Sequence, residues 1–171
     1  MGILRGRKTK DDHVRRRYRM RTKLASIGDD FWIEDAQGTR TYKVNGKALR
    51  IRETFVLEDL SGHEVAKIQE RKLSVRDKIA VERDGHTVAT VHKALVGIRH
   101  RFAIDVTDGP DLKAHGNIVD HEYEIERDGD PVAHVSKRWF RVRDTYGIEI
   151  EEGEDDALVL AIVVALEALT D

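Results

Sequence analysis

Ten consecutive apolar residues, Ala157 to Leu166, stand near the end of the 171-residue sequence. The acids Glu154, Asp155 and Asp156 precede them, and acidic side chains stabilise the beginning of a helix. We therefore predict a helix from about residue 155 to about residue 169. Its apolar side chains would cover every side of the helical wheel, so the rest of the protein must surround it. A closed barrel of strands encloses a helix in this way, whereas a sheet sandwich offers it one wall.

A repeated pattern in the middle of the chain predicts the strands. Residues 81–93 (VERDGHTVATVHK) and 125–137 (IERDGDPVAHVSK) both open with an apolar residue followed by Glu-Arg-Asp-Gly. The Asp-Gly pair allows the positive backbone angles that a tight hairpin turn requires. Looser copies begin at Ile33 and Leu57. Apolar and polar residues alternate between the turns, which indicates a mainly β protein: a closed antiparallel barrel of about twelve strands around the C-terminal helix.

Basic and acidic residues are segregated along the chain, although their totals of 30 and 32 nearly balance. Residues 1–23 carry ten basic and two acidic side chains, whereas residues 144–171 carry nine acidic side chains and no Lys or Arg. The two ends can screen each other in a folded monomer. Alternatively, the basic segment binds a polyanion. We expect residues 1–17 to form a flexible basic arm and residues 18–171 to form a single barrel domain.

A second group of cations surrounds two aromatic residues in the segment KRWFRVR, residues 137–143. If this segment is a strand, Trp139 and Phe140 face opposite sides, and the outer ring can rest at a lipid headgroup layer or on a base. The alternative is an aromatic ring covered by loops. The candidate anion-binding residues are Arg15, Arg16, Arg17, Arg19, Arg21, Lys23, Lys137, Arg138, Arg141 and Arg143.

Motifs for catalysis and metal binding are missing from the sequence. The chain has no Cys, no P-loop and no GxGxxG, and none of its four Ser lies in GxSxG. Its eight His show no HExxH spacing. In the densest group, around His115 and His121, neighbours along a strand would point to opposite faces. We predict a protein that is not an enzyme and that holds no metal and no cofactor.

Several segments, taken in their order, resemble the LURP-one-related family. They are residues 24–35 (LASIGDDFWIED), 42–49 (YKVNGKAL), 126–140 (ERDGDPVAHVSKRWF), 144–150 (DTYGIEI) and 157–169 (ALVLAIVVALEAL), and the resemblance covers residues 18–170. It implies the barrel with a central helix that is shared with the Tubby C-terminal domain and is similar to that inferred for phospholipid scramblases. Tubby domains bind phosphoinositide headgroups through basic side chains. The Cys-rich palmitoylation segment of scramblases has no counterpart in a chain without Cys.

These observations favour a cytoplasmic binding module, peripheral at the membrane, that recognises anionic phospholipid headgroups. One alternative is a protein-interaction or scaffold domain that takes an acidic partner. Another is weak nucleic-acid binding through the basic arm, which the 20 basic and 30 acidic residues of the remaining chain oppose. We expect no transmembrane span, because crossing a bilayer takes about 20 apolar residues.

Overall fold

The computed structural model describes residues 15–21, 30–49, 52–71, 77–94, 101–140 and 145–170. These residues form twelve strands, one α-helix and one 3-10 helix. The strands are β1 (Arg16–Arg21), β2 (Phe31–Asp35), β3 (Arg40–Leu49), β4 (Arg52–Glu58), β5 (Glu64–Arg71), β6 (Lys78–Arg83), β7 (His86–Lys93), β8 (Arg101–Val106), β9 (Leu112–Asn117), β10 (Glu122–Arg127), β11 (Asp130–Ser136) and β12 (Thr145–Ile150). The 3-10 helix η1 (Lys137–Trp139) lies between β11 and β12, and the helix α1 (Asp156–Ala168) follows β12.

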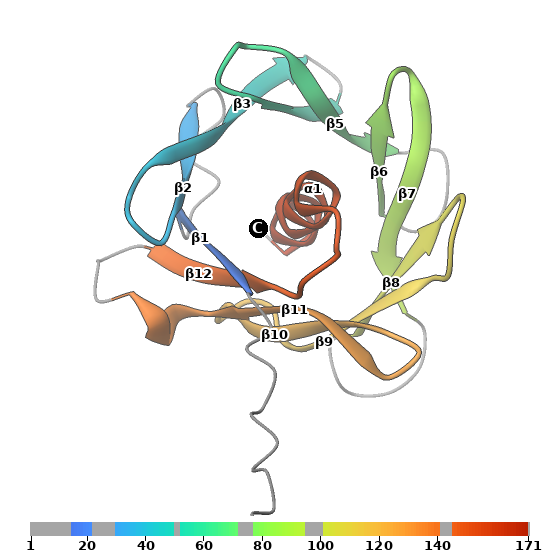
Figure 1. Ribbon diagram of the computed structural model, residues 1–171. Helices are drawn as coiled ribbons and strands as arrows, with labels where there is room; N and C mark the ends of the chain where they lie inside the picture. Colours follow the sequence, from blue (N-terminus) through green and yellow to red (C-terminus); the bar gives the residue numbers. More distant parts are fainter. Residues whose placement is uncertain are drawn as a thin grey trace, which may run out of the picture.

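The strands form a closed antiparallel barrel in which each strand pairs with its neighbours in the chain (Figure 1). Closure is made by β1, which lies between β12 and β2. The β1–β12 pairing runs over six residues, from Arg16 opposite Ile150 to Arg21 opposite Thr145. The β1–β2 pairing has two residue pairs. This architecture confirms the predicted fold class.

Four hairpins carry the same irregularity at the same place. In each, the strand register shifts within the apolar-Glu dipeptide of the sequence repeat, at Ile33-Glu34, Leu57-Glu58, Val81-Glu82 and Ile125-Glu126. Such a β-bulge sets two residues of one strand opposite one of its partner and bends the strand. The extra residues Val65, Val88 and Val132 pack against the core. The repeat therefore encodes both the turn and a bend that helps to close the barrel.

The helix α1 lies inside the ring of strands, where Figure 1 shows it almost end-on. Its residues 159–167 are all buried, and Leu160 and Val163 have no exposed surface. Asp155 is the N-cap, since its carboxylate accepts a hydrogen bond of 3.1 Å from the backbone N–H of Leu158. The predicted helix, enclosed on all sides, is confirmed. Within the described part of the chain, no helix is long and apolar enough to cross a membrane.

The barrel begins slightly earlier than the expected boundary between arm and domain. Strand β1 starts at Arg16, so Arg16 and Arg17 belong to the barrel wall. The rest of the expected arm, residues 1–14, lies outside the described residues.

Candidate functional site

Strand β1 directs its residues alternately to the two faces of the barrel wall, as strands do. Tyr18 and Met20 belong to the buried core, with 8% and 1% of their surface exposed. Arg16 shares their inner face, and Arg17 and Arg19 occupy the outer one. Arg16, Arg17 and Arg19 are thereby divided between two environments.

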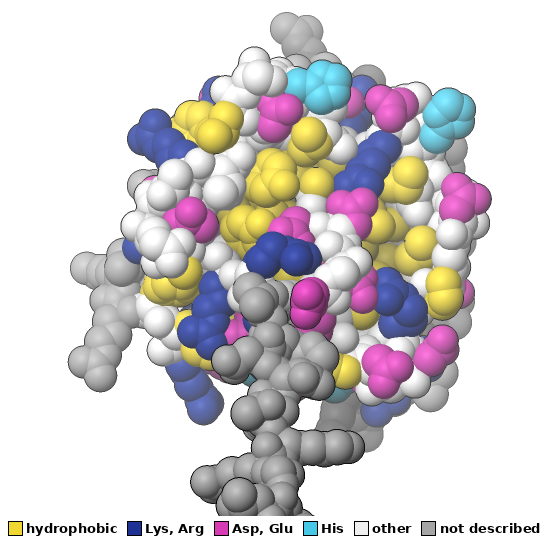
Figure 2. Space-filling view, in the orientation of Figure 1, with side chains coloured by type: hydrophobic (Ala, Val, Ile, Leu, Met, Phe, Trp, Pro, Cys, Tyr) yellow, Lys and Arg dark blue, Asp and Glu magenta, His cyan; other side chains and the backbone are white. Residues whose placement is uncertain are grey.

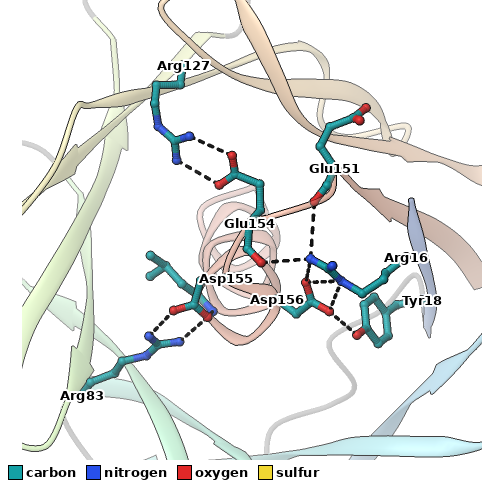
Figure 3. A network of polar contacts seen from close by, with 9 residues as sticks. Arg16, Tyr18, Arg83, Arg127, Glu151, Glu154, Asp155 and Asp156 are labelled. Atoms are coloured by element: carbon teal, nitrogen blue, oxygen red, sulfur yellow. Dashed lines mark hydrogen bonds and ion pairs between the residues drawn. The ribbon is translucent and has the colours of Figure 1, made fainter. Parts of the chain in front are cut away.

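On the inner side, Arg16 is bound to the beginning of the helix (Figure 3). Its Nε lies 2.7 and 2.6 Å from the two carboxylate oxygens of Asp156. Its Nη2 donates to the backbone carbonyl of Glu154 at 2.9 Å. The Tyr18 hydroxyl donates to the same Asp156 carboxylate at 2.5 Å, and burial together with this hydrogen bond raises the pKa of the phenol.

Two further arginines reach the beginning of the helix from other sides of the barrel (Figure 3). Arg83, the last residue of β6, makes a two-pronged contact of 2.6 and 2.9 Å with Asp155. Arg127, the last residue of β10, makes the equivalent contact of 2.8 and 3.0 Å with Glu154. Both arginines occupy the Arg position of the Glu-Arg-Asp-Gly repeat, so the repeated hairpins hold the helix as well as forming the wall.

On the outer side, Glu149 of β12 lies between two arginines. It accepts hydrogen bonds of 2.6 Å from Arg17 Nε and 2.8 Å from Arg15 Nη1. Arg15 also pairs with Glu151 at 2.9 Å. Burial opposes the ionisation of Glu149, but the hydrogen bonds from Arg17 and Arg15 outweigh it and hold the pKa of this carboxyl below its usual value.

Two aromatic rings lie on the outer face of β12, where Gly147 leaves room for them. A Cβ atom at Gly147 would be 2.7 Å from Trp139 Cε3 and 2.8 Å from Phe140 Cε2. The guanidinium carbon of Arg17 is 5.7 Å from the centre of the Trp139 ring, and that of Arg19 is 5.8 Å from the Phe140 ring. These distances are typical of cation–π contacts. We call these four side chains the platform.

The segment that brings Trp139 to the platform is η1. The Ser136 hydroxyl accepts a hydrogen bond of 3.1 Å from the Arg138 backbone N–H and caps this short helix. Residues 137–139 therefore do not form a strand, so the condition for placing the two rings on opposite faces is not met. Both rings are half-buried on the same outer face. Lys137 is exposed beside them, and 85% of the Arg138 side chain is exposed.

The structure thus brings together only part of the predicted anion-binding set. Arg17 and Arg19 belong to the platform, and Lys137 and Arg138 lie beside it. Arg15 is held by Glu149 and Glu151 on the outer side, and Arg16 by Asp156 on the inner side. Arg19 is also paired with Glu34. The backbone of Arg21 pairs with Thr145 at the same corner of the barrel. Lys23, Arg141 and Arg143 lie outside the described residues.

Charges of both signs are interspersed on the surface. On the face that Figure 2 shows, Lys and Arg side chains are mixed with Asp and Glu, and apolar patches lie between them. The ion pairs of Arg15, Arg16 and Arg17 with residues 149–156 are the mutual screening that the segregated sequence allowed. Among the described residues, no group of three or more His, Asp or Glu is placed to hold a metal ion.

Sequence reasoning missed the roles of Arg83, Arg127 and Gly147. The signal for the two arginines was available, because aligned repeats place them at the same hairpin position. Gly147 stands between the core residues Tyr146 and Ile148, so strand alternation places it on the outer face. Which ring would cover it depends on the path of η1, for which the sequence carries no periodic signal.

Comparisons with known proteins agree with this architecture. The sequence model of the LURP-one-related family matches residues 16–167. The X-ray structure of the Arabidopsis thaliana protein AT5G01750 is similar, with a TM-score of 0.66 and 16% sequence identity over 92% of each chain. At this identity the likeness concerns the fold alone. No match was found among curated proteins.

Proposed function

The chain belongs to the LURP-one-related family, and on that premise we propose that it is a non-enzymatic module that binds anionic phospholipid headgroups through its platform. The observation that carries the proposal is the placing of Arg17 and Arg19 over Trp139 and Phe140, beside the exposed Lys137 and Arg138. Indole and guanidinium groups together suit the boundary between lipid headgroups and water.

The charge at the platform favours a surface of many headgroups over one tightly bound ligand. Arg17 and Arg19 are compensated by Glu149 and Glu34. The cations that remain for a ligand are mainly Lys137 and Arg138, since Arg138 reaches Glu122 only at 3.6 Å and 85% of its side chain is exposed. Each cation near an anionic membrane contributes about 1 kcal/mol.

The test is cosedimentation of the full chain with vesicles of phosphatidylcholine alone and of equal parts phosphatidylcholine and phosphatidylserine. We expect pelleting with the anionic vesicles that weakens as salt is raised. Replacing Lys137 and Arg138 together by Ser should weaken binding about thirty-fold, the effect of two cations at a membrane surface. The matched control replaces Lys93 and Lys113, which are exposed on β7 and β9, and should bind like the wild type.

An equal loss of vesicle binding in the two double variants, or pelleting with neutral vesicles, would contradict the platform as the binding surface. The ion pairs of Arg15, Arg16 and Arg17 favour a second candidate, a protein-interaction module whose barrel is electrostatically self-contained. Failure to pellet with any vesicle would favour this candidate. A gel shift with duplex and single-stranded nucleic acid in the same series tests the remaining alternative, which is nucleic-acid binding through the basic arm.

A further inference from the structure

One outward-facing row of polar side chains crosses five neighbouring strands and ends at the platform. Strand pairing sets His115 of β9 opposite Glu124 of β10, Glu124 opposite His134 of β11, His134 opposite Glu149 of β12, and Glu149 opposite Arg17 of β1. Residues directly opposite each other on one face have Cβ atoms about 4.5–5.5 Å apart. The row therefore places two imidazoles within a line of carboxylates, one of them next to the binding surface.

His134 is the imidazole that touches the platform. Its ring centre is 4.9 Å from that of Trp139, at an interplanar angle of 84°. It also lines a groove of about 290 Å³ on the barrel wall. Arg17 lies over the same Trp139 ring. A charge on the imidazole would thus be added directly beside a guanidinium of the proposed surface.

The surroundings of His134 hold charges of both signs. They are Glu122, Glu124 and Glu126 on β10, Glu149 and Glu151 on and after β12, Arg15 and Arg17 at β1, and Lys137 and Arg138 on η1. Arg15 and Arg17 compensate Glu149, and His115 lies 3.2 Å from Glu126. Glu124 is exposed, and no ion pair of Glu124 occurs among the residues the structure describes. Its negative charge, next to the platform, repels phosphate groups.

We propose that His134 is a proton-dependent contact of this surface, which strengthens binding to anionic headgroups when the imidazole becomes charged. The inference rests on the proposed function and specifies its regulation. Histidine is the side chain that changes charge between about pH 5 and pH 8. Protonation places a cation on the platform and offsets Glu124 in the same step. Acidification thereby turns the edge of the surface from repulsive to attractive toward phosphate.

Vesicle pelleting at pH 7.5 and pH 5.5 tests the inference with three variants of the full chain. Binding of the wild type to equal parts phosphatidylcholine and phosphatidylserine should tighten about five-fold on acidification, the effect of one added cation. His134→Gln should bind like the wild type at pH 7.5 and lose the pH effect. His134→Lys should bind at both pH values as the wild type does at pH 5.5. His115→Gln, the matched control on the other side of Glu124, should keep the pH effect.

Each result decides between the two proposals. Pelleting that tightens equally in His134→Gln overturns the role of His134 and leaves the proposed function standing, as does a loss of the pH effect in both Gln variants. No pelleting at either pH overturns the proposed function and this inference with it. Thermal melts of each variant at both pH values check that the fold is retained.

Discussion

Single residues determine the character of the outer surface, and Gly147 is the clearest case. The missing side chain at this position lets two aromatic rings lie directly on β12, and these rings lie beneath the guanidinium groups of Arg17 and Arg19. Any larger residue would separate the rings from the strand. The platform thus depends on the absence of a Cβ atom at position 147 as much as on the side chains that form it.

Replacing Gly147 by Ala should displace the rings. The new Cβ would lie within 3 Å of both Trp139 and Phe140, closer than packed atoms approach. We expect the free energy of unfolding in urea to fall by about 1 kcal/mol, since the rings are at the surface and can shift. Vesicle binding should weaken as well. Gly109→Ala is the control, because its Cβ would meet its nearest neighbour at 3.6 Å; equal effects of the two substitutions would contradict the role of Gly147.

The Arg83–Asp155 contact predicts a pH dependence of stability. The hydrogen bond from Arg83 holds the pKa of Asp155 below its usual value of 3.8. A carboxyl with a depressed pKa in the folded state stabilises the protein above its usual pKa, and this contribution is lost as the pH falls through the depressed value. Asn caps a helix as well as Asp, so Asp155→Asn removes the charge and keeps the cap.

The Asp155→Asn variant should therefore be less stable than the wild type at pH 7, and the difference should vanish as the pH falls well below 3.8. Urea unfolding at a series of pH values measures it. Asp108→Asn, on an exposed turn, is the control. A difference that persists at the lowest pH would show that Asp155 acts through something other than its charge.

Among the secondary-structure elements, the hairpin repeats and the helix depend on each other. The repeat supplies the turn, the bulge and, in two copies, the arginine that holds an acid before or at the helix N-terminus. The other two copies have Asp at the arginine position. Asp35 and Asp59 instead accept hydrogen bonds from backbone N–H groups of their own turns. One sequence pattern thus serves both the barrel wall and the element inside it.

A charge in the middle of α1 should abolish the fold. Val163 has no exposed surface, and Val163→Asp would leave a carboxylate without a partner in the core. The penalty of several kcal/mol is comparable with the whole stability of a domain, about 5–15 kcal/mol. We expect no cooperative thermal transition by circular dichroism. Leu60→Asp makes the same chemical change at a side chain that is 65% exposed and should melt like the wild type; normal melting of Val163→Asp would refute the enclosed helix as the core.

At the scale of the whole molecule, a single strand closes the barrel. Strand β1 begins within the expected arm of residues 1–17, yet it joins β12 to β2 and carries both the inner and the outer arginines. The fold and part of the proposed site therefore share this strand.

Two N-terminal truncations separate these roles. Removing residues 1–14 retains all twelve strands, and the melting temperature should stay close to that of the full chain. Removing residues 1–21 deletes β1 and exposes the edges of β2 and β12, which invites strand pairing between molecules. Size-exclusion chromatography with light scattering should show aggregates for the longer deletion alone. A monomeric, cooperatively melting product would contradict the closure by β1.

The fold could be predicted from the sequence because its signals are local. Alternation, Asp-Gly turns and an apolar run each lie within a few residues of chain, and together they define strands, hairpins and an enclosed helix. The contacts of the site are not local. Arg17 meets Glu149 across 132 positions, and Arg16 meets Asp156 across 140. These pairs depend on the register of β1 on β12, which no short pattern contains, although Tyr18 and Met20 do mark the inner face that Arg16 shares.

The order of the elements has a consequence for biosynthesis. Because α1 comes after every strand, the ribosome synthesises the helix that fills the barrel after all the strands. Until then, twelve nascent strands have no central partner on which to pack their apolar sides, and such intermediates are prone to aggregate. Maturation of this protein should therefore lag behind translation and benefit from chaperones that shield the growing polypeptide.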